Sequence, residues 1–253
     1  MNTQLIGQFA PVLTAHRAPV VRDEALLLQA DGDLKVYYAP FEYINPTARL
    51  VLVGITPGPT QMENANDKAR HALMAGMGLE QALKLAKETA SFSGNEMRSN
   101  LIRQLNHWGV QTWLGLGNSD ELFSTARHML HNTSLLRYPV FYKNKPYGGN
   151  PNMTRHPMLR QYLMDNFVQE IKQLKDAKFF ALGATVKKVF DALVEEGVLD
   201  EERIIRGLFH PSPQCSTRIN YVLSDRTGHM PHATTCVPYD QGRHDFQRKL
   251  LAA

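Results

Sequence analysis

The pattern of apolar and polar positions along the chain predicts strands and helices that alternate from residue 34 to residue 210. The nearly continuous apolar run Leu50-Val51-Leu52-Val53 is typical of a strand buried on both faces, so a strand is predicted over residues 49–55. Between residues 157 and 174, apolar side chains recur every three or four positions, which is the spacing of an amphipathic helix. Further strands are predicted over residues 34–39, 138–143, 178–182 and 204–209, and further helices over residues 61–89 (interrupted by Gly76 and Gly78), 98–108, 120–130 and 184–196. Helix-like apolar spacing also occurs around residues 25–28.

Strands that alternate with helices are the signature of an α/β protein whose sheet is covered on both faces. We therefore expect a single domain over residues 1–253, built as a three-layer α/β/α sandwich with a mostly parallel central sheet. In such sheets, ligands bind outside the carboxyl ends of the strands. The segments around Gly54, Asn144 and His210 each follow a predicted strand, so all three are expected at that edge.

Composition narrows the functional classes without choosing one. The chain has 253 residues, of which 43% are hydrophobic and 21% charged, as in ordinary soluble proteins. Two cysteines, Cys215 and Cys236, exclude a disulfide framework or a four-thiolate metal site within one chain. The net charge of +4 and pI near 9.0 are compatible with nucleic acid binding but do not establish it. No secretory signal and no apolar stretch of about 18 residues is found, so a cytoplasmic protein without membrane contact is expected.

Two short segments carry the candidate chemistry. The first is Gly54-Ile55-Thr56-Pro57-Gly58, where glycine permits close backbone approach to a ligand and proline stiffens the turn. It lacks the Gly-Lys-Ser/Thr ending of a phosphate loop, and a plain strand-to-helix turn is the alternative interpretation. The second is His210-Pro211-Ser212-Pro213, in which a histidine follows an apolar run and precedes a rigid proline-containing segment. A structural histidine is the alternative there, and the combination of both segments favours function.

Taken together, these segments resemble the uracil-DNA glycosylase superfamily, whose first motif has a Gly-x-x-Pro core and whose second is His-Pro-Ser. Three further stretches are similar in the same order: Phe92-Ser93-Gly94-Asn95, Phe141-Tyr142-Lys143-Asn144, and Gly149-Asn150 through Arg155-His156-Pro157. A fourth, Ala181-Leu182-Gly183-Ala184-Thr185, resembles a turn of the thermophilic-type branches. The resemblance extends from about residue 50 to residue 215 and implies an α/β glycosylase fold.

The resemblance implies a role for each matching residue. His210 would donate a hydrogen bond to the base that leaves, Phe92 would stack on the flipped base, and Asn144 would read its pyrimidine edge. Backbone groups of Gly54, Ile55, Pro57 and Gly58 would line the base pocket. Contacts to DNA are expected from Ser212, Pro213, Gln214, Arg155, Arg218 and Lys145, although a solvated surface is the alternative for each basic residue.

Two departures from the superfamily pattern affect the chemistry. The thermophilic-type branches hold an iron–sulfur cluster on four cysteines, whereas this chain has only two. Neither a metal nor another cofactor is therefore expected in this chain. At Thr56, where many relatives have Asp or Asn to hold the attacking water, and at Asn95, where one branch has an acid, this chain has neutral side chains. A threonine hydroxyl can orient water but cannot act as a base near neutral pH.

These observations predict a monofunctional DNA glycosylase that removes uracil or a 5-substituted pyrimidine, including hypermodified cytosine of phage DNA, in base-excision repair or phage defence. Gly58 stands where strict uracil enzymes have a tyrosine that blocks pyrimidine C5, which motivates the wider substrate range. The partner would be single- or double-stranded DNA that contains a modified base, with no obligate protein partner. Two alternatives remain open: a catalytically inactive modified-DNA or abasic-site binding protein of the same superfamily, and another α/β hydrolase or nucleotide-processing enzyme.

Overall fold

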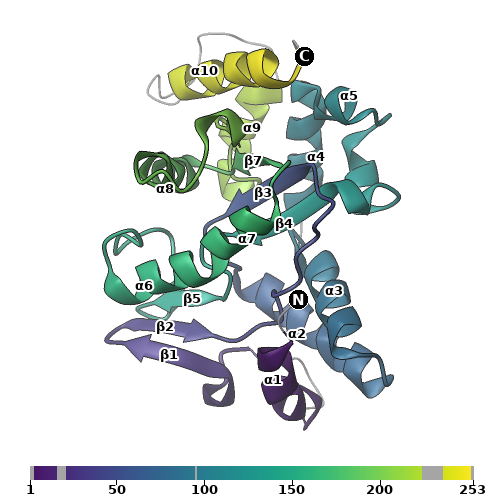
Figure 1. The fold of residues 1–253 in the computed structure, drawn as a ribbon, viewed down its shortest axis with the longest axis vertical. Helices are drawn as coiled ribbons and strands as arrows, with labels where there is room; N and C mark the ends of the chain where they lie inside the picture. Colours follow the sequence, from purple (N-terminus) through teal and green to yellow (C-terminus); the bar gives the residue numbers. More distant parts are fainter. Residues whose placement is uncertain (1–2, 16–20, 95, 224–235, 252–253) are drawn as a thin grey trace. The chain divides into compact units, whose positions relative to one another are not determined.

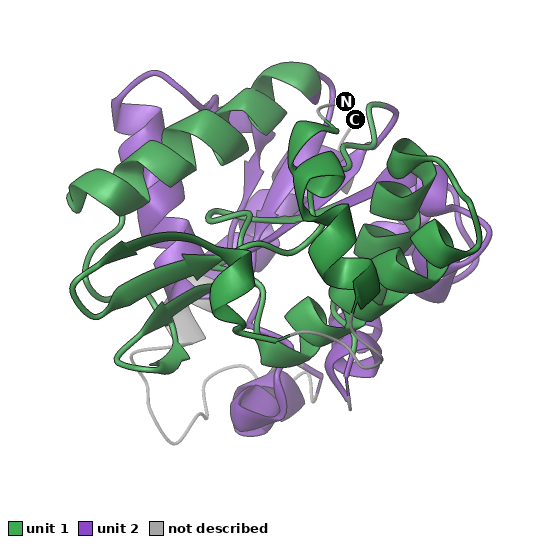
Figure 2. Ribbon diagram, turned by 90° about the horizontal axis from the view of Figure 1, so that it is seen from below, with its two compact units in different colours: residues 1–46, 55–93, 132–173 green, residues 47–54, 94–131, 174–253 purple. Residues whose placement is uncertain are grey.

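The computed structural model describes residues 3–15, 21–94, 96–223 and 236–251. The chain forms two compact units, each assembled from three separate segments (Figure 2). Unit 1 comprises residues 1–46, 55–93 and 132–173, and unit 2 comprises residues 47–54, 94–131 and 174–253. The first candidate segment therefore lies where the chain passes from unit 2, at Gly54, to unit 1, at Ile55.

Unit 1 contains an antiparallel sheet with the strand order β1-β2-β5-β6 (Figure 1). In its register, Leu34 of β2 pairs with Tyr142 of β5, and Tyr142 pairs in turn with Lys145 of β6. Val36 and Val140 pair across β2 and β5 and both are buried, so one face of the sheet joins the core of the unit. The strands are β1 (Leu27–Asp31), β2 (Leu34–Tyr37), β5 (Val140–Tyr142) and β6 (Lys145–Pro146).

The helices of unit 1 bury alanine-rich and leucine-rich faces. α2 and α3 pack side by side (Figure 1), and both present small buried residues such as Ala69 and Ala86 to the core. Gly76, with φ +74°, lies in the turn between them, where a left-handed conformation favours glycine. The helices are α1 (Gln4–Ala15), α2 (Pro59–Met74), α3 (Leu79–Ala90), α6 (Pro157–Tyr162) and α7 (Val168–Gln173), the last two joined by a π-helical turn over Leu163–Phe167.

Unit 2 is built on a second four-stranded sheet with the order β4-β3-β7-β8. β3 pairs with β7 and β7 with β8, both in parallel. Every residue of β3 is buried, as expected for a central strand covered on both faces. The strands are β3 (Leu50–Gly54), β4 (Leu130–Ser134, whose last three residues belong to unit 1), β7 (Lys178–Ala181) and β8 (Ile204–Ile205). The helices are α4 (Met97–Trp108), α5 (Val110–Leu114), α8 (Ala184–Glu195), α9 (Ser216–Leu223) and α10 (Cys236–Phe246).

The structure confirms a mixed α/β fold with a parallel sheet, and it corrects several predicted elements. The antiparallel sheet of unit 1, which also has four strands, was not predicted. Around residues 25–28 the chain forms a 3-10 turn and then β1 rather than a helix. Residues 120–130 form two short 3-10 turns followed by β4, and the strand predicted over 204–209 is only two residues long. Across the described segments, every helix is too short or too polar to span a bilayer.

Candidate functional site

The turn after β3 is held by the side chain of Gln61, on the first turn of α2. The Gln61 Oε1 accepts a hydrogen bond from the Gly58 backbone N–H at 3.1 Å, so this amide is already occupied within the protein. A Cβ on Gly58 would lie 2.7 Å from the same oxygen. The φ of Gly58, −82°, is accessible to other residues. The approach of Gln61, rather than the backbone conformation, therefore favours glycine at position 58.

Gln61 also joins this turn to the segment that contains Phe92. Its Nε2 donates to the Ser93 backbone oxygen at 2.7 Å, and the neighbouring Asn64 Nδ2 donates to Ser93 Oγ at 2.8 Å. Phe92 is half-buried and has φ +50°, a left-handed conformation that is rare for an aromatic residue. Two segments that the sequence analysis assigned to one base pocket therefore lie together within unit 1. Asn95 lies outside the described residues.

Thr56 is engaged in hydrogen bonds within unit 1. Its hydroxyl donates to the Tyr138 backbone oxygen at 2.9 Å and accepts from the Val140 N–H at 3.0 Å. A hydroxyl has one proton and two lone pairs, so a single acceptor lone pair remains for water. Ile55 and Pro57, on either side, are half-buried and buried respectively. Thr56 thus fastens the turn to the chain that leads into β5, and its capacity to orient water is limited.

In unit 2, the conformation around His210 fixes the protonation of the imidazole. The Ser212 backbone N–H donates to His210 Nδ1 at 3.3 Å, so Nδ1 acts as the acceptor and the proton of the neutral ring is on Nε2. Burial lowers the pKa of His210 below its ordinary value of 6.5. At neutral pH the residue is therefore an uncharged imidazole whose Nε2–H can donate a hydrogen bond to a ligand.

Two buried amides of α4 hold the backbone next to His210. The side chain of Gln104 accepts from the Phe209 N–H at 3.1 Å and donates to the Phe209 oxygen at 3.3 Å. Asn100 Nδ2 donates to the Pro211 oxygen at 3.2 Å. Both amides are at most 5% exposed. The sequence analysis missed these positioning residues, and two amides one turn apart on a predicted helix face were the only available signal.

Gly183, in the turn after β7, lies against the His210 segment and is favoured there by its backbone conformation. Its N–H donates to the Leu208 oxygen at 2.9 Å, and a Cβ on Gly183 would lie 3.7 Å from the His210 Cβ. Its φ of +92° is also strained for any other residue. β8 ends at Ile205, so residues 206–212 form a connection outside any helix or strand and His210 does not directly follow a strand. α4 and Gly183, rather than a long strand, therefore position this histidine.

The placement predicted for Asn144 is wrong. Asn144 lies in the exposed turn between β5 and β6 of the antiparallel sheet, with φ +59°, and its backbone oxygen accepts from Arg22 Nη1 at 3.2 Å. It is not at an edge of the parallel sheet. The asparagine that a strand of the parallel sheet carries is Asn132, on β4 beside β3. Its Oδ1 is buried and has no hydrogen-bond partner in the described part of the chain. The sequence analysis missed it because the polar letters of His131, Asn132 and Thr133 concealed the strand.

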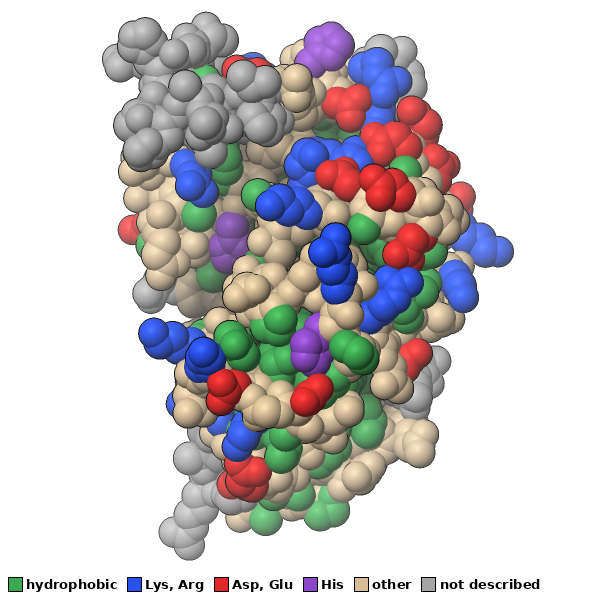
Figure 3. Space-filling view, turned by 90° about the vertical axis from the view of Figure 1, so that its left-hand side faces the viewer, with side chains coloured by type: hydrophobic (Ala, Val, Ile, Leu, Met, Phe, Trp, Pro, Cys, Tyr) green, Lys and Arg blue, Asp and Glu red, His purple; other side chains and the backbone are tan. Residues whose placement is uncertain are grey.

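The residues expected to contact DNA differ in exposure. Gln214, Pro213 and Arg218 are exposed in unit 2, and Lys145 and Arg155 are exposed in unit 1. Ser212 is 8% exposed, because it is turned toward His210 and Cys215, so it is better placed to fix the histidine than to bind phosphate. On the face drawn in Figure 3, basic side chains are interspersed with acidic ones. Within the residues that the structure describes, no cluster of three His, Cys, Asp or Glu side chains could hold a metal.

Comparison with known proteins identifies a relative of this chain. The chain is 38% identical over 219 residues to a Bacillus subtilis (strain 168) protein named "Uncharacterized protein YoxB", and the match covers 84% of this chain and 85% of the relative. No protein-family model matches the sequence. No solved structure matches it.

Proposed function

The chain belongs to the same family as YoxB of Bacillus subtilis, and we propose that it is a DNA glycosylase that removes a flipped-out modified pyrimidine. The observation that carries this proposal is the imidazole of His210. It is neutral, its tautomer is fixed by the Ser212 N–H, and its flanking backbone is held by α4. A rigid neutral donor is suited to stabilise an anion that develops on a ligand.

Hydrolysis of an N-glycosidic bond requires that stabilisation. As the bond between the sugar C1′ and the base nitrogen breaks, its electron pair leaves with the base, and positive charge develops on the sugar. The His210 Nε2–H would donate to the base carbonyl oxygen, where the negative charge accumulates. Water then bonds to C1′ and loses a proton to solvent, and the base anion takes up a proton, leaving an abasic site. A neutral histidine keeps its donor throughout, because the pKa of the imidazole is lowered.

Three elements are proposed to recognise the base. Phe92 would stack on its face, and the Gly54–Gly58 turn would line its edge. We propose Asn132, in place of Asn144, as the residue that reads the pyrimidine edge, because its side-chain oxygen is buried and unpartnered in the described part of the chain. Without a side chain on Gly58, a substituent on pyrimidine C5 would be admitted once Gln61 moves, because its Oε1 lies 2.7 Å from the place of a Cβ.

A binding protein without catalysis is the second candidate, and Thr56 favours it. The hydroxyl proton of Thr56 is already donated to the Tyr138 oxygen, so no described residue of the proposed set is a base able to activate water. In the glycosylase, water would attack a sugar that is already cationic, and weak orientation would suffice. Both candidates use one domain with a three-layer α/β/α arrangement, a DNA partner, a cytoplasmic setting and no cofactor.

The test is base release from labelled single- and double-stranded oligonucleotides that carry uracil, 5-hydroxymethyl or glucosylated pyrimidines, followed by alkaline cleavage. We expect an abasic site with at least one 5-substituted base. His210→Ala is expected to lower the rate on the order of 100- to 1,000-fold, whereas His244→Ala, at an exposed position of unit 2, serves as the matched control. Salt-dependent binding of modified DNA without base release would support the binding protein instead. No DNA affinity together with hydrolysis of free nucleosides would overturn both.

A further inference from the structure

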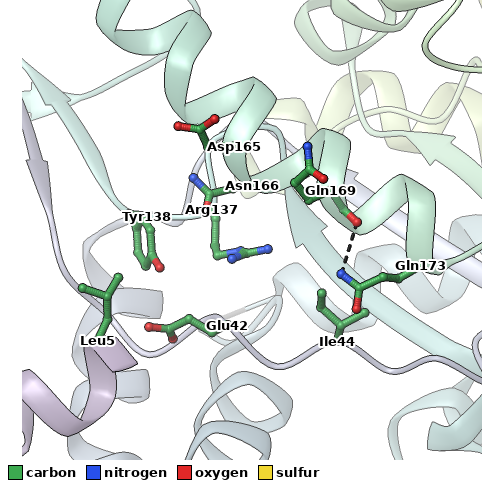
Figure 4. A pocket seen from close by; sticks show the side chains of 9 residues that line it. All are labelled: Leu5, Glu42, Ile44, Arg137, Tyr138, Asp165, Asn166, Gln169 and Gln173. Atoms are coloured by element: carbon green, nitrogen blue, oxygen red, sulfur yellow. Dashed lines mark hydrogen bonds between the residues drawn. The ribbon is translucent and has the colours of Figure 1, made fainter. Parts of the chain in front are cut away.

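Unit 1 contains a cavity of about 490 Å³ between α1, the loop after β2 and the helical segment of α6 and α7. Its size is in the range of small-molecule sites. Figure 4 shows that side chains from these separate elements face the cavity. Its lining consists of Leu5, Glu42, Ile44, Arg137, Tyr138, Asp165, Asn166, Gln169 and Gln173. None of these residues belongs to the set proposed for base excision, so the cavity has no role in that proposal.

Glu42 is the unusual member of this lining. The residue is only 4% exposed, and neither carboxylate oxygen has a well-formed hydrogen bond in the described part of the chain. Burial of an acid without partners is costly, and the usual explanation is a ligand or a functional role. Glu42 lies on the same side of the cavity as Tyr138 (Figure 4). Its two oxygens are therefore acceptors without a well-formed hydrogen bond from the described residues, beside an open space.

The cavity offers more acceptors than donors. The Nε and Nη2 of Arg137 both donate to Glu170 Oε1, at 2.8 and 2.7 Å, so the positive charge of the guanidinium is already balanced by a fully buried carboxylate. The Nδ2 of Asn166 donates to the Tyr162 oxygen at 3.0 Å, which leaves its Oδ1 as the free end of the amide. Asp165 adds a second carboxylate at an exposed position. A ligand that fits must supply N–H donors and positive charge.

We propose that this cavity binds a small organic cation whose ammonium or guanidinium group docks on the Glu42 carboxylate. The cation would donate to both oxygens and complete the compensation of the buried charge, to which Arg137 and Lys87 contribute only in part. A planar guanidinium matches a carboxylate with two parallel hydrogen bonds. The carbon chain of the ligand would contact Leu5 and Ile44, and a second donor would reach Asn166 or Asp165.

Binding of a cation must release protons, because Glu42 is partly protonated in the free protein. Burial raises the pKa of Glu42 to about 7, while Arg137, the Tyr38 hydroxyl and Lys87 act in the opposite direction. The other charged or titratable groups around it are Glu170, which is paired with Arg137, Tyr138, whose pKa is raised, and exposed Asp165. At pH 7, about half a proton should therefore leave per bound cation.

The experiment is isothermal titration of the full chain with agmatine, methylguanidine and putrescine, with succinate as the anionic control. We expect saturable one-to-one binding of at least one cation at pH 8, and about tenfold weaker binding at pH 6, where Glu42 is mostly protonated. Proton release is measured by comparing buffers of different ionisation enthalpy. This measurement uses the unmodified protein, so it does not depend on how a variant folds.

Glu42→Gln keeps the shape of the side chain and removes its charge. It is expected to weaken cation binding by about 10- to 100-fold, the usual effect of losing a charged hydrogen bond. Glu80→Gln, at an exposed position of α3, should leave binding unchanged. The proposal is overturned if no cation binds at concentrations up to about 1 mM, if succinate binds instead, or if Glu42→Gln binds as tightly as the wild type.

Discussion

The buried carboxyl of Glu42 makes the stability of this protein depend on pH in a direction opposite to that of most acids. A carboxyl with a raised pKa binds its proton more tightly in the folded than in the unfolded chain, so it stabilises the fold at low pH. The benefit is complete below the ordinary pKa of 4.5 and is lost as the pH rises through about 7. We expect Glu42→Gln, which cannot ionise, to remove this dependence.

The magnitude follows from the two pKa values. A rise from 4.5 to about 7 corresponds to about 3.4 kcal/mol over the full titration, since each pH unit is worth about 1.4 kcal/mol. About 2.5 kcal/mol of that change falls between pH 5 and pH 8. Relative to wild type, the Glu42→Gln variant should therefore gain about 2.5 kcal/mol of unfolding free energy when the pH is raised over this interval.

The assay is urea unfolding of both proteins at several pH values from 5 to 8, followed by circular dichroism. Burial lowers the pKa of Lys87 to about 8 and the charge of Glu42 raises it, so the difference between the two proteins also contains the part of the Lys87 titration that depends on Glu42. Glu80→Gln controls for the loss of one surface carboxylate. The result would refute a raised pKa of Glu42 if the two stability curves ran parallel, with the difference in unfolding free energy between wild type and Glu42→Gln changing by less than about 0.5 kcal/mol.

Three further predictions concern the candidate site. Gln104→Leu should destabilise the protein by about 2 kcal/mol, because two hydrogen bonds to Phe209 are lost at about 1 kcal/mol each. Gln111→Leu, at a glutamine whose buried Oε1 lacks a partner among the described residues, should cost almost nothing. Equal effects of the two substitutions would contradict the role of Gln104 in holding Phe209. The pKa of His210 lies below 6.5 in the folded protein, so as the pH falls the unfolded chain binds a proton at this residue before the folded protein does. His210 therefore favours folding fully above pH 6.5 and less as the pH falls. A base-release rate that already declines between pH 8 and pH 6.5 would argue against a neutral donor. Asn132→Ala should reduce base release by at least tenfold and Asn144→Ala by less than twofold, and the reverse order would restore the original assignment.

Strong apolar patterns made much of the fold predictable. The run in β3 predicted a strand buried on both faces, and the spacing of Leu101, Leu105 and Trp108 predicted the buried face of α4. β4 was missed because His131 and Thr133 are polar yet buried, at 2% and 8% exposure, so tertiary context outweighed residue type. β1 was missed because three leucines in succession fit a helix or a strand equally well.

The candidate site was predictable only where a residue type is itself unusual. The histidine directly before Pro211-Ser212-Pro213 drew attention to position 210, but its tautomer depends on the Ser212 N–H and its placement on Gln104. The hydrogen bonds of Gln104 join residues 105 positions apart and leave no local signal in the sequence. Thr56 shows the converse: the residue type allowed a role with water, while the fold gives its hydroxyl to the backbone of unit 1.

The alternation of the two units along the chain limits how the protein can be divided. Three segments of each unit alternate, so the polypeptide passes between them five times. Neither unit corresponds to one continuous stretch of the gene. Truncation at any boundary between segments therefore leaves at least one unit incomplete. A ribosome must also complete residue 173 before all of unit 1 has been synthesised. The separate roles of the two units can therefore be tested by point substitutions and chemical cross-linking, but not by expressing halves of the chain separately.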